Sequence, residues 1–364
     1  MTTLSRDASV VGPPAGRRAT MRDVAALAGV GIKTVSRVVN GEPGVSPALT
    51  ERVATAAAQL DFQPDMSAGN LRRSVRRSRS LGLILASVDN PFCSAIHRAV
   101  EDVAEKRGVA VLTASTDEQP ERERALVAAF TSRRVDGLIV SPTSGGQAHL
   151  VPELRAGTPV VTVDRPPTGI DVDTVLVDNA AGAAGATAHL LGGGHRRIAY
   201  LGDLSTIATA RYRREGYQRA MAEAGVPVDE RWVVDDLHDA EVAYAAVHRL
   251  LREDDAPTAL FTSQNLVTIG AIRALRSLGL HHDVAVVGFD DFLLADLMEP
   301  AVTVVAQDPT AIGRTAAERV FARLDGDDQE AQHLTVPTRL VQRGSGEIRV
   351  GGGRTSSRGR DERP

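Results

Sequence analysis

The chain has 364 residues, of which 43% are hydrophobic, a formal net charge of −4 and a single cysteine, Cys93. This length accommodates a small domain together with a larger body, and no stretch approaches the roughly 18 consecutive apolar residues of a transmembrane helix. The polar N-terminus is not a secretory signal, and one cysteine excludes an internal disulfide and a thiolate metal site. We therefore expect a soluble, cytoplasmic protein and predict neither a metal site nor a cofactor.

Charge is distributed unevenly along the chain. Between residues 17 and 79, eleven Lys and Arg residues stand against five Asp and Glu residues, so this segment carries +6 and residues 80–364 carry −10. A basic segment beside an acidic body is typical of a head that binds a polyanion. The composition of residues 1–17 and of the Gly/Arg/Ser-rich residues 344–364 predicts two disordered tails.

Residues 20–40 predict two short helices joined by a tight turn, which is the helix-turn-helix arrangement of DNA-binding proteins. Thr20 and Asp23 have the spacing of a capping box, and Gly29 suits the left-handed end of the first helix. Three valines of the second helix are spaced to pack inward, namely Val35, Val38 and Val39. The residues left to face outward are Ile32, Lys33, Thr34, Ser36 and Arg37. An ordinary helical hairpin with a solvated face is the alternative reading.

A third helix is predicted directly after this motif. Ser46 is a suitable N-cap and Pro47 suits the first helical position. Val53, Ala57 and Leu60 form its expected buried stripe. Three helices then complete a small domain over residues 18–63.

Residues 64–79 follow as a basic connecting segment. Gly69 and Asn70 are poor helix formers, so an isolated helix here is expected to be unstable. Such a segment suits a helix that folds only when it binds DNA. The alternative is a plain linker whose Leu71 packs on the head.

From Ser80 onward, short apolar runs alternate with amphipathic helices, which predicts an α/β fold with parallel sheets covered on both faces. Strands are predicted at residues 81–85, 109–113, 137–140, 160–163, 198–201, 259–261 and 284–288. Helices are predicted at residues 92–107, 121–132, 180–191, 211–224, 240–251, 266–278 and 310–323. Polar residues follow several of these strands, where parallel sheets commonly bind ligands.

Several motifs resemble those of the LacI/GalR family of bacterial transcription regulators. In the head they include Thr34-Val35-Ser36-Arg37 and Asn40-Gly41, and in the body Gly194-His195-Arg196-Arg197 and Gly288-Phe289-Asp290-Asp291. The resemblance covers residues 20–342. It implies an all-α helix-turn-helix headpiece (18–63), a hinge helix and linker (64–79), and a periplasmic-binding-protein-like effector domain (80–343). That domain is expected to form two lobes with parallel sheets, with the chain crossing between them.

The resemblance also implies which residues contact operator DNA. By position these are Thr20, Ile32, Lys33, Thr34, Ser36, Arg37, Asn40 and Leu71. Ile32 and Lys33 are expected to select bases, Arg37 to contact phosphates or base edges, and Leu71 to enter the minor groove. Gly31 departs from the family, which usually has a serine there.

Effector-binding residues follow from the same resemblance. They are Phe92, Asp164, Arg213, Gln264, Asp290 and Gln307. An arginine and carboxylates suit the neighbouring hydroxyls of a sugar or polyol. The pair Gln264-Asn265 departs from the Asn-Asp common in the family. Each position also has a purely structural alternative. Asp290 could cap a helix or turn, Arg213 could lie on the surface of its helix, and Phe92 could belong to the hydrophobic core.

We therefore predict a homodimeric transcription regulator, most often a repressor in such families, that binds a double-stranded operator. A small molecule, either a sugar or a related polyol or nucleoside, is expected to control it. The protein is expected in the bacterial cytoplasm, associated with the nucleoid when bound to its operator. The alternatives are a solute-binding protein, which predicts an export signal, and a sugar-modifying enzyme, although no Gly-x-Ser-x-Gly elbow or P-loop is present.

Overall fold

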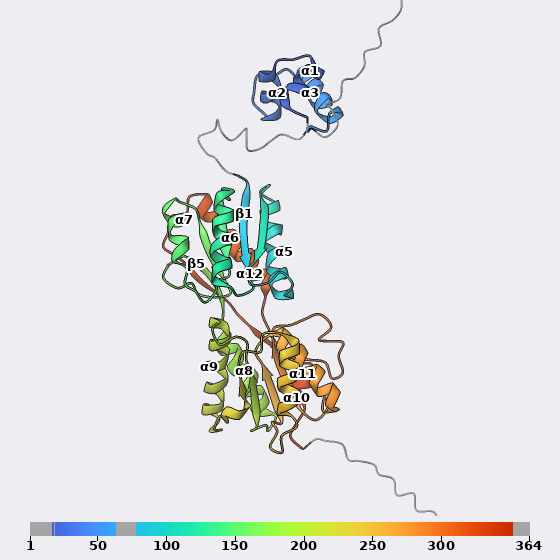
Figure 1. Ribbon diagram of the computed structural model, residues 1–364, viewed down its shortest axis with the longest axis vertical. Helices are drawn as coiled ribbons and strands as arrows, with labels where there is room; N and C mark the ends of the chain where they lie inside the picture. Colours follow the sequence, from blue (N-terminus) through green and yellow to red (C-terminus); the bar gives the residue numbers. More distant parts are fainter. Residues whose placement is uncertain (1–16, 18, 63–77, 352–364) are drawn as a thin grey trace, which may run out of the picture. The chain divides into compact units, whose positions relative to one another are not determined.

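The computed structural model describes residues 17, 19–62 and 78–351, and it divides into two compact units between Ser78 and Arg79 (Figure 1). The first unit is helical and the second is α/β. None of the helices in these residues is long and apolar enough to cross a membrane. The predicted hinge segment, including Leu71, lies outside the described residues.

The helical unit contains α1 (Met21–Ala28), α2 (Ile32–Val39) and α3 (Pro47–Gln59). Val24, Val35 and Val53, one from each helix, are almost completely buried and form the centre of its core. Ala57 and Leu60 are only half-buried, whereas Ala56 lies deeper than expected. The three predicted helices are confirmed.

Local capping explains where these helices begin and end. The Thr20 amide donates to Asp23 Oδ2 at 2.7 Å, and the Leu49 amide donates to Ser46 Oγ at 3.4 Å. Gly29 ends α1 in the left-handed conformation, with φ of 59°. Arg52 of α3 donates to the carbonyl of Ala28 at 2.6 Å, so the third helix stabilises the exposed end of the first. Arg17, predicted as part of the tail, forms an ion pair with Asp23 at 3.1 Å.

The α/β unit contains two six-stranded sheets, which define two lobes. In lobe 1 every strand pairing is parallel, in the order β11-β5-β4-β3-β1-β2. Its strands are β1 (Ser80–Leu85), β2 (Ala110–Ser115), β3 (Gly137–Val140), β4 (Val160–Val163), β5 (Asp173–Val177) and β11 (His333–Val336). Lobe 2 has the order β12-β10-β9-β8-β6-β7, and only its edge strand β12 is antiparallel. Its strands are β6 (Ile198–Leu201), β7 (Val233–Val234), β8 (Ala259–Thr262), β9 (Ala285–Phe289), β10 (Thr303–Ala306) and β12 (Arg339–Val341).

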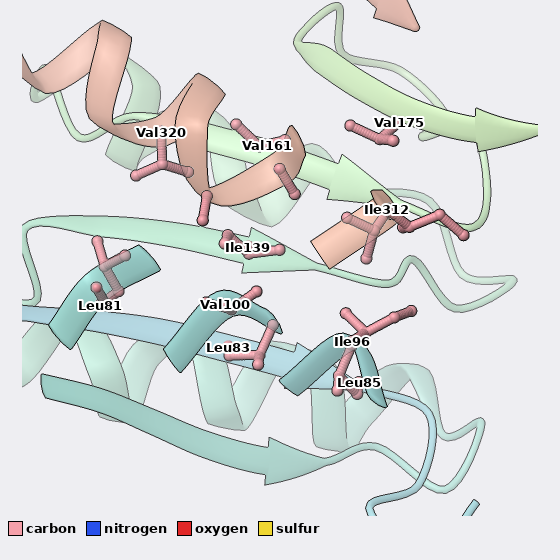
Figure 2. Close-up of a cluster of buried hydrophobic side chains, with 14 of the residues drawn as sticks. Leu81, Leu83, Leu85, Ile96, Val100, Ile139, Val161, Val175, Ile312 and Val320 are labelled. Carbon is pink, nitrogen blue, oxygen red and sulfur yellow. The ribbon is translucent and has the colours of Figure 1, made fainter. Parts of the chain in front are cut away.

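Helices cover both faces of each sheet. Lobe 1 has α5 (Pro91–Glu105) and α12 (Pro309–Leu324) on one face, and α6 (Pro120–Ser132) and α7 (Val151–Arg155) on the other. Lobe 2 has α8 (Asn179–Gly192) and α9 (Ala208–Glu223) on one face, and α10 (Ala240–Leu250) and α11 (Asn265–Leu278) on the other. Figure 2 shows Leu81, Leu83 and Leu85 along β1, with Leu85 next to Ile96 of α5. Ile312 of α12 belongs to the same core. Alternate residues of a strand face opposite sides, so Ile84 packs in the other core, with α6.

The chain crosses between the lobes three times. It leaves lobe 1 after Val177, where β5 is followed by α8 of lobe 2. It returns after Ala306, where β10 is followed by α12 of lobe 1, and it leaves again after Val336, where β11 is followed by β12 of lobe 2. The predicted class, two lobes with parallel sheets after a helical head, is confirmed. The strands β5, β7, β10, β11 and β12 were not predicted.

The prediction of a disordered C-terminal tail is wrong for its first part, residues 344–351. Residues 344–351 are described, and Ser345–Glu347 form a 3₁₀ helix in which Ser345 is buried. The Thr303 hydroxyl donates to Glu347 at 2.8 Å, and His195 Nε2 lies 2.7 Å from the carbonyl of Ile348. These contacts attach the segment to lobe 2, although its composition resembles that of a tail.

Candidate functional site

The outer face of α2 is the candidate DNA-binding surface. Ile32 is 47% exposed, and Lys33 and Arg37 are exposed as well, whereas Thr34 and Ser36 are half-buried. The burial of Val35 against α1 and α3 sets this orientation. An exposed apolar side chain on the same helix as two exposed cations is suited to contact bases while the cations contact phosphates.

Several of the candidate DNA-binding residues also have partners within the head. The Thr20 hydroxyl donates to Asp23 at 2.6 Å, and Asn40 Nδ2 donates to Ser36 Oγ at 3.2 Å. Arg37 Nε lies 4.0 Å from the Glu42 carboxylate, and both side chains are largely exposed. A surface ion pair this long contributes little, so the Arg37 guanidinium is free to exchange Glu42 for a phosphate.

Substitutions on α2 should separate affinity from specificity. Arg37→Ala is expected to weaken binding to every DNA sequence and to reduce the salt dependence of the binding constant, because one phosphate contact is lost. Replacing Ile32 or Lys33 should instead change which half-site is preferred. Binding to a library of half-sites, measured at several salt concentrations, checks both. A change of preferred sequence in Arg37→Ala would contradict its assignment.

In the α/β unit, two aspartates occupy equivalent positions at the carboxyl ends of strands in the two sheets. Asp164 follows β4 and Asp290 follows β9, with φ of 67° and 71°. The Asp164 amide donates to the carbonyl of Val175 and the Asp290 amide to that of Val305, each at 2.9 Å. Both side chains are buried. Each lobe thus contributes one carboxyl group to the same region.

Arg213 of α9 is buried beside Asp290. Its Nε donates to Asn179 Oδ1 at 2.7 Å, its Nη1 donates to the carbonyl of Ser263 at 2.6 Å, and its guanidinium lies 3.8 Å from the centre of the Phe289 ring. The distance from Arg213 Nη1 to Asp290 Oδ2 is 3.7 Å. The reading of Arg213 as a surface residue is therefore wrong.

The close packing of α9 on α8 allows this placement. Gly216, almost one helical turn after Arg213, lies against α8 so closely that a Cβ atom there would clash with the carbonyl of Ala180. Asn179, at the start of α8, is thereby within reach of the Arg213 side chain. Gly216 thus has a steric role in forming the site.

Burial raises the pKa of both aspartates above the ordinary value, while neighbouring cations act in the opposite direction. Burial raises the pKa of Asp290, although Arg213 and a hydrogen bond from Gln307 act in the opposite direction. Burial likewise raises the pKa of Asp164 against the effect of Arg165. Buried carboxyl groups whose pKa is shifted by burial and by nearby cations are characteristic of binding sites.

The other candidate effector residues have mixed surroundings. Gln307 Nε2 donates to Asp290 Oδ1 at 2.5 Å, while its buried Oε1 has no hydrogen-bond partner in the described part of the chain. Gln264 accepts from the Leu266 amide at 2.9 Å and donates to the carbonyl of His238 at 3.1 Å, so it acts as a helix cap. Phe92 packs against the core of lobe 1. Arg213, Asp290 and Gln307 therefore lie together, and Asp164 extends from the other lobe.

Three polar pairs in this region were not among the predicted site residues. Arg165 donates to both oxygens of Glu118, at 2.6 and 2.8 Å. Asn265 Nδ2 of lobe 2 donates to Asn90 Oδ1 of lobe 1 at 3.0 Å. His238 Nδ1 lies 2.8 Å from Asp203 Oδ1. Their position just after strands was the available signal, but the pairings join residues distant in sequence.

The His238 pair should make stability depend on pH. The hydrogen bond with Asp203 raises the pKa of His238 above its ordinary value of 6.5, against the effect of burial. A raised folded-state pKa adds to the unfolding free energy below pH 6.5, and this contribution disappears as pH rises through the folded-state value. The side chain is half-exposed, so solvent screening limits the contribution to less than about 1 kcal/mol.

Chemical denaturation at several pH values checks this expectation. The difference in unfolding free energy between wild type and His238→Gln should be larger at acid pH than at alkaline pH. Asp203→Asn should remove the same pH-dependent part, and the double variant should remove no more. Additive losses would show that the two side chains do not act as a pair.

A helix-turn-helix unit joined to a two-lobed α/β unit with a buried polar site defines a DNA-binding regulator rather than an enzyme. Residues 20–65 match the model of bacterial regulatory proteins of the lacI family, and residues 187–346 match a periplasmic binding protein-like domain. The chain is 30% identical to the ribose operon repressor of Haemophilus influenzae, over 90% of this chain and 98% of that protein. It belongs to the LacI family of transcription regulators.

Solved structures agree with this assignment. The transcriptional regulator CelR in complex with cellobiose is 32% identical, covering 90% of this chain and all of CelR, with a TM-score of 0.66. The Lac repressor dimer bound to operator and the anti-inducer ONPF is 25% identical, covering 91% of this chain and 99% of that one, with a TM-score of 0.79. The likeness spans both units, so it covers the head as well as the lobes.

Proposed function

We propose that this protein is a homodimeric repressor whose affinity for a pseudo-palindromic operator is controlled by a small molecule bound between the two lobes. The observation that carries the proposal is the buried group of Arg213, Asp290 and Gln307 in lobe 2, approached by Asp164 of lobe 1. The effector class is a sugar or a related polyol or nucleoside. Cellobiose in the CelR structure supports that class, and the Lac repressor dimer on its operator supports the assembly.

The DNA-binding role is assigned to Thr20, Ile32, Lys33, Thr34, Ser36, Arg37, Asn40 and Leu71. The exposure of Ile32, Lys33 and Arg37 on α2 supports this assignment. The effector-binding role is assigned to Phe92, Asp164, Arg213, Gln264, Asp290 and Gln307. The protein acts in the bacterial cytoplasm and is associated with the nucleoid when bound to its operator.

Coupling between the two sites follows from the chain path. Two separately folded lobes joined by three crossings can change their relative angle when a ligand contacts both. Lobe 1 begins directly after the predicted hinge, so a change between lobes moves the hinges and the heads of the dimer. A coupling free energy of about 1–3 kcal/mol is sufficient for such control.

Gel-shift titration tests this function. The full chain should bind DNA from upstream of its own gene more tightly than unrelated DNA of the same length. Compounds that bind the protein in a thermal-shift screen of sugars, polyols and nucleosides should change that affinity. Unchanged operator affinity with every compound that binds would refute the coupling, and equal affinity for all DNA would refute sequence-specific regulation.

A further inference from the structure

We propose that Glu123 and Gln147 of lobe 1 are positioning residues for effector binding, which hold the segment that carries Asp164 and Arg165. The inference rests on the proposed function, because it concerns how one of the candidate effector residues is held in place. Both side chains are fully buried, with 0% of the residue surface exposed. Neither was among the predicted effector-binding residues.

Glu123 places a buried carboxylate in the first turn of α6. Its Oε2 accepts from the Thr143 amide at 2.6 Å, and its Oε1 accepts from Gln147 Nε2 at 3.4 Å and lies 3.1 Å from His149 Nε2. A negative charge in the first turn of a helix is also favoured by the helix dipole. Because a buried carboxylate is costly without partners, Glu123 fixes the loop after β3 that supplies them.

Gln147 extends this connection to the segment after β4. Its Nε2 also donates to the carbonyl of Thr143 at 3.0 Å, and its Oε1 accepts from the Thr168 amide at 2.7 Å. The backbone amide of Gln147 donates in turn to the carbonyl of Thr168 at 3.0 Å. One buried side chain therefore joins α6 to the loops after β3 and β4.

The segment from the end of β4 to Thr168 is short and stiff. It consists of Asp164-Arg165-Pro166-Pro167-Thr168. The two prolines restrict φ to about −65°, so the segment has little conformational freedom. Holding Thr168 at one end and β4 at the other therefore determines where the Asp164 and Arg165 side chains lie.

Close packing prevents the loop after β3 from absorbing a displacement. A Cβ atom at Gly145 would lie 2.5 Å from the Cβ of Pro120, which begins α6. The Arg165 Nη1 donates to the carbonyl of Pro142 at 3.3 Å, so this loop also contacts the segment after β4 directly. Closely packed interiors transmit strain, and a change at Glu123 should therefore reach Arg165.

Glu123→Gln tests the connection in the full chain while it preserves the shape of the side chain. In either orientation of the new amide, its NH2 group meets another donor, either Gln147 Nε2 or the Thr143 amide. The Thr168 amide, which is bound to Gln147 rather than to Glu123, should then exchange with solvent about 10-fold faster. Residue-resolved hydrogen exchange by NMR measures this rate. The Leu138 amide of β3 is the internal reference, since only a general loss of stability would accelerate both amides.

Effector binding provides the second measurement. D-ribose, cellobiose and adenosine are titrated by calorimetry, and the compound that wild type binds most tightly should bind Glu123→Gln about 10-fold more weakly. Operator affinity without compound should not change, because the head is a separate compact unit. Gln147→Leu should have a similar effect. The double variant should bind no more weakly than the weaker single variant, because the two residues act in one chain of contacts.

Glu121→Gln is the matched control. Glu121 lies two residues before Glu123 on α6, its side chain is 81% exposed, and it forms an ion pair of 3.4 Å with Arg124. This substitution removes the same charge from the same helical turn. It should change neither the exchange of the Thr168 amide nor the affinity for the compound.

Unchanged exchange of the Thr168 amide in a folded Glu123→Gln protein would overturn the proposal, and so would unchanged affinity for the compound. If Glu123→Gln does not fold, Gln147→Leu replaces it under the same criteria. If wild type binds none of the three compounds, the proposed effector class is rejected. The exchange rates of Thr168 and Leu138 then decide by themselves whether Glu123 positions the segment after β4.

Discussion

Arg213→Ala is expected to abolish the response to the effector while operator binding is retained. Arg213 is buried, donates to Asn179 and Ser263, and lies beside Asp290, so its removal empties the centre of the site and leaves Asp290 without its cation. Losing one partner of a buried, hydrogen-bonded charge pair should weaken effector binding by about 100-fold or more. Calorimetry with a compound that binds in the thermal-shift screen, alongside gel shifts with and without that compound, measures both effects.

Arg211→Ala is the matched control. Arg211 belongs to the same helix, but it is exposed, and within the described residues it donates to the carbonyls of Ser205 and Thr206. Its removal should leave effector binding unchanged. Thermal melting of both variants distinguishes a lost contact from a lost fold. Loss of operator binding in a folded Arg213→Ala protein would mean that the residue has a structural role extending to the head.

A chain that begins at Ser80 should lose specific operator binding. The helical unit ends before this residue, and it contains all the candidate DNA-binding residues of α2. The α/β unit has its own hydrophobic cores on both sheets, so it should fold and retain effector binding. Specific binding is typically about 10³-fold or more tighter than nonspecific binding, and this difference should disappear in a gel shift.

The truncated chain also has an internal control. Its stabilisation by a compound that binds the full chain should equal that of the full chain, which would show that loss of DNA binding does not reflect unfolding. If the truncated chain still distinguished its operator from unrelated DNA, the assignment of the head as the DNA-binding unit would be rejected.

The elements that were predicted well are those with local signals. Residues 137–140, 160–163 and 198–201 form strands with the predicted bounds, because each is a short apolar run with clear flanks. The head followed from caps that lie within a few residues of their partners, such as Thr20 with Asp23. Asp164 and Asp290 each directly follow a strand, but their assignment to the effector site came from the resemblance to the LacI/GalR family.

The elements that were missed depend on distant residues. β5 begins with Asp173, whose burial is possible because Arg319 and Arg323 of α12 bind its carboxylate at 3.0 and 2.8 Å. No local pattern indicates that an arginine more than a hundred positions away will compensate the charge of a buried aspartate in a strand. The Glu118–Arg165 pair and the Asn90–Asn265 contact were missed for the same reason.

The three crossings between lobes have a consequence for synthesis on the ribosome. The head is complete once its third helix has emerged, and it can fold while the rest is being translated. Lobe 1 cannot be completed at that stage, since α12 and β11 are encoded after almost all of lobe 2. Until then, the strands β1–β5 lack the covering helix α12 and the edge strand β11. The nascent regulator therefore acquires a folded DNA-binding head well before the domain that controls it is finished.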